Sequence, residues 1–101
     1  MNIKRKQDGN KMNVAISGRI DTATAPVFEE DVKPHLDGIT ELILDFKEVN
    51  YVSSAGLRVL LTLQKKMSAQ GEMKLINVSE AVSDVFEVTG FDEILNFETS
   101  K

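Results

Sequence analysis

Several residue types are scarce, and each shortage excludes a class of protein. The 101 residues include no cysteine and a single histidine, His35. A disulfide framework and a cysteine or two-histidine metal site are therefore excluded. No apolar run approaches the roughly 20 residues that cross a bilayer, and the start, MNIKRKQDGN, lacks the apolar stretch of a secretory signal. We expect a cytoplasmic protein that binds no metal, carries no cofactor and inserts in no membrane.

The remaining composition is that of one ordinary folded domain. The hydrophobic fraction is 42% and the charged fraction is 28%, and neither a repeat nor a linker rich in proline or glycine divides the chain. We predict a single domain over residues 1–101. The net charge of -4 argues against nucleic acid as a partner, because phosphate binding needs clustered basic side chains.

The first residues predict a β-hairpin. Residues 2–7 form a strand candidate, and residues 12–20 alternate between apolar and polar side chains. Asp8 and Gly9 lie between them, and Asp-Gly is a strong hairpin-turn signal. We expect two antiparallel strands, of which the second is half buried.

A helix is predicted over residues 22–38, where apolar side chains recur at intervals of three and four. Thr22 or Thr24 is expected to cap its start. Pro34 should distort the last turn, because proline lacks the N–H that a helix interior needs. Gly38 should end the segment.

The middle of the chain predicts two strands around a long helix. Residues 39–46 form a compact apolar run, which we interpret as a strand buried on both faces with parallel neighbours. The helix is expected over residues 54–70, ended by Gly71. Residues 72–78 then form a second short buried strand.

The end of the chain predicts one further helix with clear end signals. Ser79 should cap residues 80–89, and Gly90 should end them. Residues 91–95 suggest one more helical turn and residues 96–99 a last extended piece. Strands and helices alternating after a hairpin predict an α/β fold: a mixed, mostly parallel sheet of four or five strands, with an antiparallel edge strand and helices packed mainly on one face.

The segment YVSSAGLRVLL, residues 51–61, holds the candidate functional residues. Ser53 is placed to be the N-cap of the helix. Ser54 then lies in the first turn with no capping duty, and Ala55 and Gly56 are too small to cover its hydroxyl. One interpretation is helix capping alone, which is common for such a pair. The other is that Ser54 is a phosphorylation site, because a helix N-terminus tolerates an anion.

A resemblance bears on that choice. The segment LILDFKEVNYVSSAGLRVLLTLQKKM resembles the signature of the STAS domain family, and more narrowly that of bacterial anti-sigma factor antagonists. The segments SGRIDTATA and INVSEAVSDVFEVTGFDEIL are similar to the family's first strand-to-helix corner and its closing strand-helix segment. The resemblance covers residues 12–97, and it implies a single STAS-like domain.

The resemblance also implies a function. In this family the unmodified antagonist binds an anti-sigma factor that is also a serine kinase, which frees a sigma factor. The kinase uses ATP to phosphorylate the antagonist, the complex dissociates, and a serine phosphatase resets it. The target serine lies two residues before the Gly-Leu pair, which makes it Ser54. The docking surface implied by the resemblance comprises Asp21, Thr22, Ser53, Ser54, Ala55, Gly56, Leu57 and Arg58.

Two departures from the family pattern leave alternatives open. Ser53 stands where the best-known members often have Asp, so Ser53 is an alternate phosphorylation site. Ala55 stands where Ser or Thr is common. Asp21 either joins the docking surface or only caps the first helix. The alternative function is a STAS module that is never phosphorylated and acts as a constitutive structural subunit, for example of a lipid-transport ABC complex.

An enzyme is not expected. A catalytic serine needs a base oriented by a third group, and His35 lies in an unrelated segment. The sequence SSAG has one glycine and no following lysine, so it is not a phosphate-binding loop. We expect a monomer or weak dimer. The sequence names neither the sigma factor nor the pathway.

Overall fold

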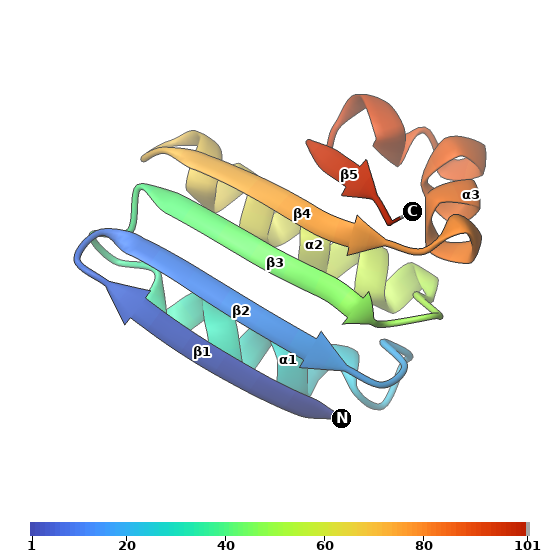
Figure 1. The fold of residues 1–101 in the computed structure, drawn as a ribbon, viewed down its shortest axis with the longest axis horizontal. Helices are drawn as coiled ribbons and strands as arrows, with labels where there is room; N and C mark the ends of the chain where they lie inside the picture. The colour runs from blue at the N-terminus through green and yellow to red at the C-terminus, as the bar shows by residue number, and fades with distance from the viewer. Residues whose placement is uncertain (101) are drawn as a thin grey trace.

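The computed structural model describes residues 1–100, in which five strands form one sheet and three α-helices pack against it (Figure 1). Lys101, the last residue of the expected domain, lies outside the described part. Two short 3-10 helices complete the elements. Their bounds are β1 (Asn2–Asp8), β2 (Lys11–Ser17), α1 (Ala25–Val32), η1 (Lys33–His35), β3 (Glu41–Glu48), α2 (Ser54–Ser68), β4 (Glu72–Val78), α3 (Glu80–Thr89), η2 (Phe91–Glu93) and β5 (Phe97–Thr99).

The strands lie side by side in the order in which they occur in the sequence. The edge strand β1 pairs antiparallel with β2, and every later neighbour pair is parallel. This arrangement confirms the predicted mixed sheet and its antiparallel edge strand. The carboxyl ends of β2, β3 and β4 consequently meet at one edge of the sheet, at the right in Figure 1.

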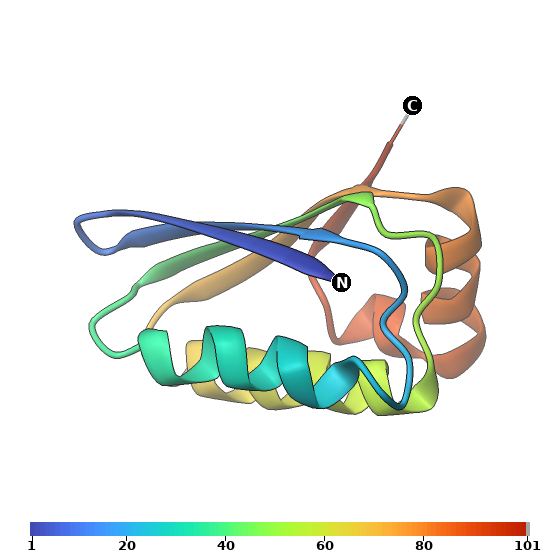
Figure 2. The same cartoon turned by 90° about the horizontal axis from the view of Figure 1, so that it is seen from below.

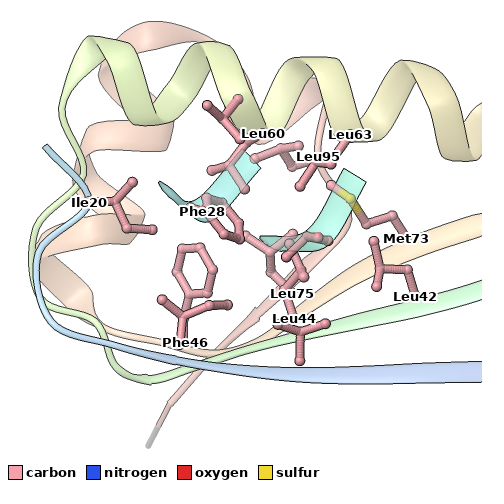
Figure 3. Packing of buried hydrophobic residues seen from close by; sticks show 14 of the residues in the cluster. Ile20, Phe28, Leu42, Leu44, Phe46, Leu60, Leu63, Met73, Leu75 and Leu95 are labelled. Carbon is pink, nitrogen blue, oxygen red and sulfur yellow. The ribbon is translucent and has the colours of Figure 1, made fainter. Parts of the chain in front are cut away.

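Helices α1 and α2 lie next to each other under one face of the sheet, as Figure 2 shows. Between them and the strands lies the core, which includes Phe28 of α1, Leu60 and Leu63 of α2, and Leu44 and Phe46 of β3, all fully buried (Figure 3). Each such side chain contributes roughly 1.5–3 kcal/mol through burial. Within residues 1–100, no helix has the length and apolar character needed to cross a membrane.

The expectation that residues 39–46 are buried on both faces is wrong. In β3, Leu42, Leu44 and Phe46 are buried, whereas Ile43 and Asp45 between them are only half buried. Their face of the sheet carries no helix (Figure 2). The apolar composition of the run correctly indicated parallel neighbours, but the layer of helices covers one face only.

The helix ends follow most of the sequence signals. Pro34 lies where α1 gives way to the 3-10 turn η1, as expected from its missing N–H. Gly38 and Gly90 adopt left-handed backbone angles, with φ of 81° and 80°. Ser79 accepts a hydrogen bond from the backbone N–H of Val82 at 3.2 Å, which confirms it as the cap of α3.

Candidate functional site

Two chain segments meet at the carboxyl edge of β2 and β3. The corner between β2 and α1 contains Ile20, and the loop between β3 and α2 contains Val52; the two residues form an isolated parallel bridge. The N–H of Ile20 donates to the carbonyl of Tyr51 at 3.0 Å, and the N–H of Ser53 donates to the carbonyl of Ile20 at 2.8 Å. The corner and the serine loop therefore form one continuous surface, where open α/β sheets usually meet ligands and partners.

The two serines of the loop have different structural roles. Ser53 is the N-cap of α2, and its side-chain oxygen accepts the backbone N–H of Gly56 at 3.3 Å. Ser54 is the first residue of α2 and is exposed. Within residues 1–100 no side-chain hydrogen bond involves the Ser54 hydroxyl. Ser53 thus stabilises the helix, whereas the Ser54 hydroxyl is accessible and unengaged.

Gly56 and Leu57 support the loop from below. A Cβ at Gly56 would lie 2.7 Å from Ile20 Cγ2 and 2.9 Å from Val52 Cγ1, so only glycine fits without displacing the corner. Leu57 is 7% exposed and belongs to the core. Their side-chain positions lie beneath the exposed loop, and a contact of either residue with a partner stays a prediction.

Asp21 organises the corner before α1. Its Oδ1 accepts the backbone N–H groups of Ala23 and Thr24, each at 3.0 Å. Thr24 occupies the N-cap position of α1, but its hydroxyl makes no cap hydrogen bond to that helix. Instead, the hydroxyl oxygen accepts the N–H of Asp21 at 2.8 Å, and the hydroxyl donates to the carbonyl of Arg19 at 2.6 Å. Thr24 therefore occupies the predicted cap position but does not cap the helix through its side chain, because its hydroxyl is engaged with Asp21 and Arg19.

Hydrogen bonds keep the Asp21 carboxyl ionised. The backbone N–H of Thr24, then its hydroxyl, lower the pKa of Asp21 below its ordinary value, and the N–H of Ala23 and the charge of Arg19 act in the same direction. The lowered pKa means that folding favours the charged form. This contribution to stability is complete above the ordinary pKa and is lost as the pH falls through the lowered one.

A surface hollow of about 200 Å³ lies between the first turns of α1 and α2. Three residues of the predicted docking surface line it: Thr22 from the corner, and Ala55 and Arg58 from α2. Arg58 is exposed. Glu29 of α1 contributes the opposite charge. The structure therefore brings the exposed members of the predicted set to one end of the molecule, around the exposed Ser54.

The sequence interpretation missed Arg19 as part of this surface. Its guanidinium carbon lies 4.1 Å from the centre of the Tyr51 ring, and both side chains are exposed. The bridge between Ile20 and Val52 creates this contact. Nothing in the linear sequence pairs position 19 with position 51. The one local signal is Gly18, a glycine that directly follows β2 and whose φ of 106° turns the chain into the corner.

Replacing Ser53 with alanine is expected to lower the free energy of unfolding by about 1 kcal/mol, because the cap hydrogen bond to Gly56 is lost. Ser79→Ala, which removes the equivalent cap of α3, should cost a similar amount. Ser54→Ala should change stability by less than about 0.5 kcal/mol, because its hydroxyl is exposed. Urea denaturation measures all three. Equal losses at Ser53 and Ser54 would contradict the assigned roles.

Comparisons with known proteins agree with this geometry. A family model described as the STAS domain matches residues 2–101. The anti-sigma-B factor antagonist of Bacillus subtilis is 35% identical over 97 residues, which cover 95% of this chain and 89% of the relative.

Two solved structures show the same fold at low sequence identity. The Bacillus anti-sigma factor antagonist SpoIIAA in its unphosphorylated form has a TM-score of 0.81 at 18% identity, covering 97% of this chain and 89% of its own. The murine anion transporter Slc26a9 has a TM-score of 0.78 at 21% identity, over 95% of this chain and 17% of the transporter. The chain belongs to the STAS domain family, and its sequence is similar to that of bacterial anti-sigma factor antagonists.

Proposed function

We propose that this protein is an anti-sigma factor antagonist controlled by phosphorylation of Ser54. Its unmodified form binds an anti-sigma factor that is also a serine kinase, and a sigma factor is released. Two observations support this proposal. The antagonist from Bacillus subtilis is similar over nearly the whole chain, and Ser54 is the exposed serine of the loop while Ser53 is engaged as a cap.

In the proposed reaction the bound kinase transfers the γ-phosphoryl group of ATP to Ser54 Oγ. The bond between the γ-phosphorus and ADP breaks, a bond to Ser54 Oγ forms, and the hydroxyl proton is released. The product carries about -1.5 to -2 charges at neutral pH. A small neutral side chain on the docking surface thereby becomes a bulky anion, and the complex dissociates. A serine phosphatase hydrolyses the ester and restores the binding form.

The fold should survive this modification. Ser54 is the first residue of α2, and within residues 1–100 no acceptor is found for the backbone N–H groups of Ser54 and Ala55. These groups and the positive end of the helix dipole stabilise a phosphate by roughly 0.3–1 kcal/mol at an exposed site. Phosphorylation should therefore change the binding surface without unfolding the helix. The phosphorylated form of Bacillus SpoIIAA has the same fold, with a TM-score of 0.73.

The alternative is a constitutive STAS module that is never phosphorylated. The fold of this chain also occurs within the Slc26a9 transporter, so the fold alone does not select the antagonist function. Ser54 is then an ordinary first-turn residue, and the same surface holds its partner permanently.

The two functions differ in what happens when the protein meets ATP and anti-sigma factor kinases from its own organism. We expect the intact mass to rise by one phosphate, and peptide mapping to place that phosphate on Ser54. Ser53→Ala should still be modified, and Ser54→Ala should not. If the phosphate is found only on Ser53, the cap residue is the phosphorylation site. If none of these kinases modifies the protein, the result favours the constitutive module.

A further inference from the structure

The side chain of Arg19 is held in place on the exposed surface next to the serine loop. Its guanidinium carbon lies 4.1 Å from the centre of the Tyr51 ring, a distance at which a cation is attracted to the face of an aromatic ring. The side chain of Arg19 is nevertheless 62% exposed, and Tyr51 is 40% exposed. The contact therefore restrains the cation without covering it.

The backbone that carries Arg19 is fixed on both sides. The N–H of Gly18 donates to the carbonyl of Glu48 at 3.0 Å, and the N–H of Ile20 donates to the carbonyl of Tyr51 at 3.0 Å. The Arg19 carbonyl accepts from the hydroxyl of Thr24 at 2.6 Å. Because the backbone is fixed and the guanidinium rests on the Tyr51 ring, the Arg19 side chain loses less conformational freedom when a partner binds it than a free arginine does.

The charge of Arg19 is only partly satisfied within the chain. Its Nε lies 3.9 Å from Asp21 Oδ2, which is long for an ion pair, and the other oxygen of that carboxylate accepts from Ala23 and Thr24. Within residues 1–100 the terminal nitrogens of Arg19 have no hydrogen-bond acceptor among the side chains. Their planar arrangement suits a carboxylate that binds with both oxygens.

From these contacts we infer that Arg19, held over Tyr51, selects a partner that presents a carboxylate to this surface. The inference rests on the proposed function and adds the chemistry of the partner. The chain as a whole carries a net charge of -4 and repels an acidic partner at long range. A fixed cation at the docking surface offers such a partner one place where its carboxylate is attracted instead. It also explains the direction of the switch, because a phosphate on Ser54 places negative charge on the surface that receives the carboxylate.

The test measures the affinity of the anti-sigma factor kinase that phosphorylates this chain, by calorimetric titration without ATP. Arg19→Glu is expected to lower the affinity at least tenfold, because like charges then face each other. Lys65→Glu is the matched control: it makes the same change in net charge on an exposed residue near the other end of α2 and should change the affinity less than twofold. Thermal melting of each variant verifies folding.

Two milder variants separate the parts of the contact. Arg19→Lys keeps the charge but loses the planar pair of donors. Tyr51→Leu leaves Arg19 unchanged but removes the aromatic ring that restrains it. We expect each variant to lower the affinity for the kinase about threefold to tenfold. Exchanging the recognised kinase carboxylate for lysine should restore binding of Arg19→Glu and weaken binding of the unchanged chain.

The outcomes distinguish this inference from the function on which it rests. If Arg19→Glu binds like Lys65→Glu while Ser54→Asp loses affinity, the carboxylate contact is wrong and the proposed function stands. If Arg19→Glu binds more tightly, the partner presents a cation there and the inference is overturned. If no anti-sigma factor kinase binds the unchanged chain, the proposed function fails and this inference fails with it.

Discussion

Ser54→Asp is expected to lower the affinity for the partner kinase by about tenfold to a hundredfold, equivalent to about 1.4–2.8 kcal/mol. The change places a permanent negative charge at the exposed first position of α2, on the surface formed by the serine loop and the corner that contains Asp21. The stability of the protein should be unchanged or slightly higher, because an anion is favoured at a helix N-terminus. Titration calorimetry measures the affinity, and urea denaturation measures the stability.

Ser54→Ala is the matched control for this prediction. It removes the hydroxyl and adds no charge, so it should bind the kinase as the unchanged chain does. With ATP present, the complex of the unchanged chain should dissociate as phosphate is transferred, whereas the Ser54→Ala complex should persist. If Ser54→Asp bound with unchanged affinity, charge at position 54 would not control the complex, and the proposed switch would be wrong.

Much of the fold is predictable because its signals are local. Ser79 and Gly90 bracket α3, and each acts through a hydrogen bond or backbone angle within one turn of itself. The alternation of buried and exposed residues in β2 likewise follows directly from the two-residue period of a strand. The error in β3 has another origin: whether Ile43 is covered depends on where the helices pack, which its own sequence does not specify.

The candidate site is predictable only where one segment is sufficient to define it. The capping role of Ser53 and the exposure of Ser54 both follow from the start of α2. Asp21, by contrast, had two open interpretations, and its hydrogen bonds to Ala23 and Thr24 show that it organises the corner. The contact of Arg19 with Tyr51 depends on the bridge between Ile20 and Val52, which are distant in the sequence, so no local sequence pattern predicts it.

Gly71 lies beyond the end of the helix that it was predicted to end, because α2 ends at Ser68 and its C-cap is Ala69. A glycine at such a position commonly ends a helix in a left-handed backbone, as Gly90 does for α3. The φ of Gly71 is not in the positive range that Gly90 adopts. What requires glycine is the backbone of Thr40: a Cβ at position 71 would lie 2.6 Å from the Thr40 carbonyl carbon and close to its oxygen.

Gly71→Ala is therefore expected to lower the free energy of unfolding by about 3 kcal/mol or more, a large share of the roughly 5–15 kcal/mol typical of a domain. The Thr40 carbonyl is not free to move, because it accepts the N–H of Glu72 at 2.9 Å where β3 and β4 begin to pair. The side chain of Gln70 also donates to the carbonyl groups of Leu36 and Ile39, at 2.5 and 2.7 Å. Urea denaturation and thermal melting measure the loss.

Gly9→Ala separates this close approach from the ordinary cost of replacing a glycine. Gly9 has a φ of 61°, and no atom lies within 4 Å of the place that a Cβ would take, so alanine there meets backbone strain but no collision, and about 1 kcal/mol should be lost. A loss at Gly71 no greater than that at Gly9 would contradict the close packing of the turn between α2 and β4 against Thr40. A larger loss, with kinase binding retained at low temperature, would show that the turn after α2 stabilises the fold while the start of α2 presents Ser54.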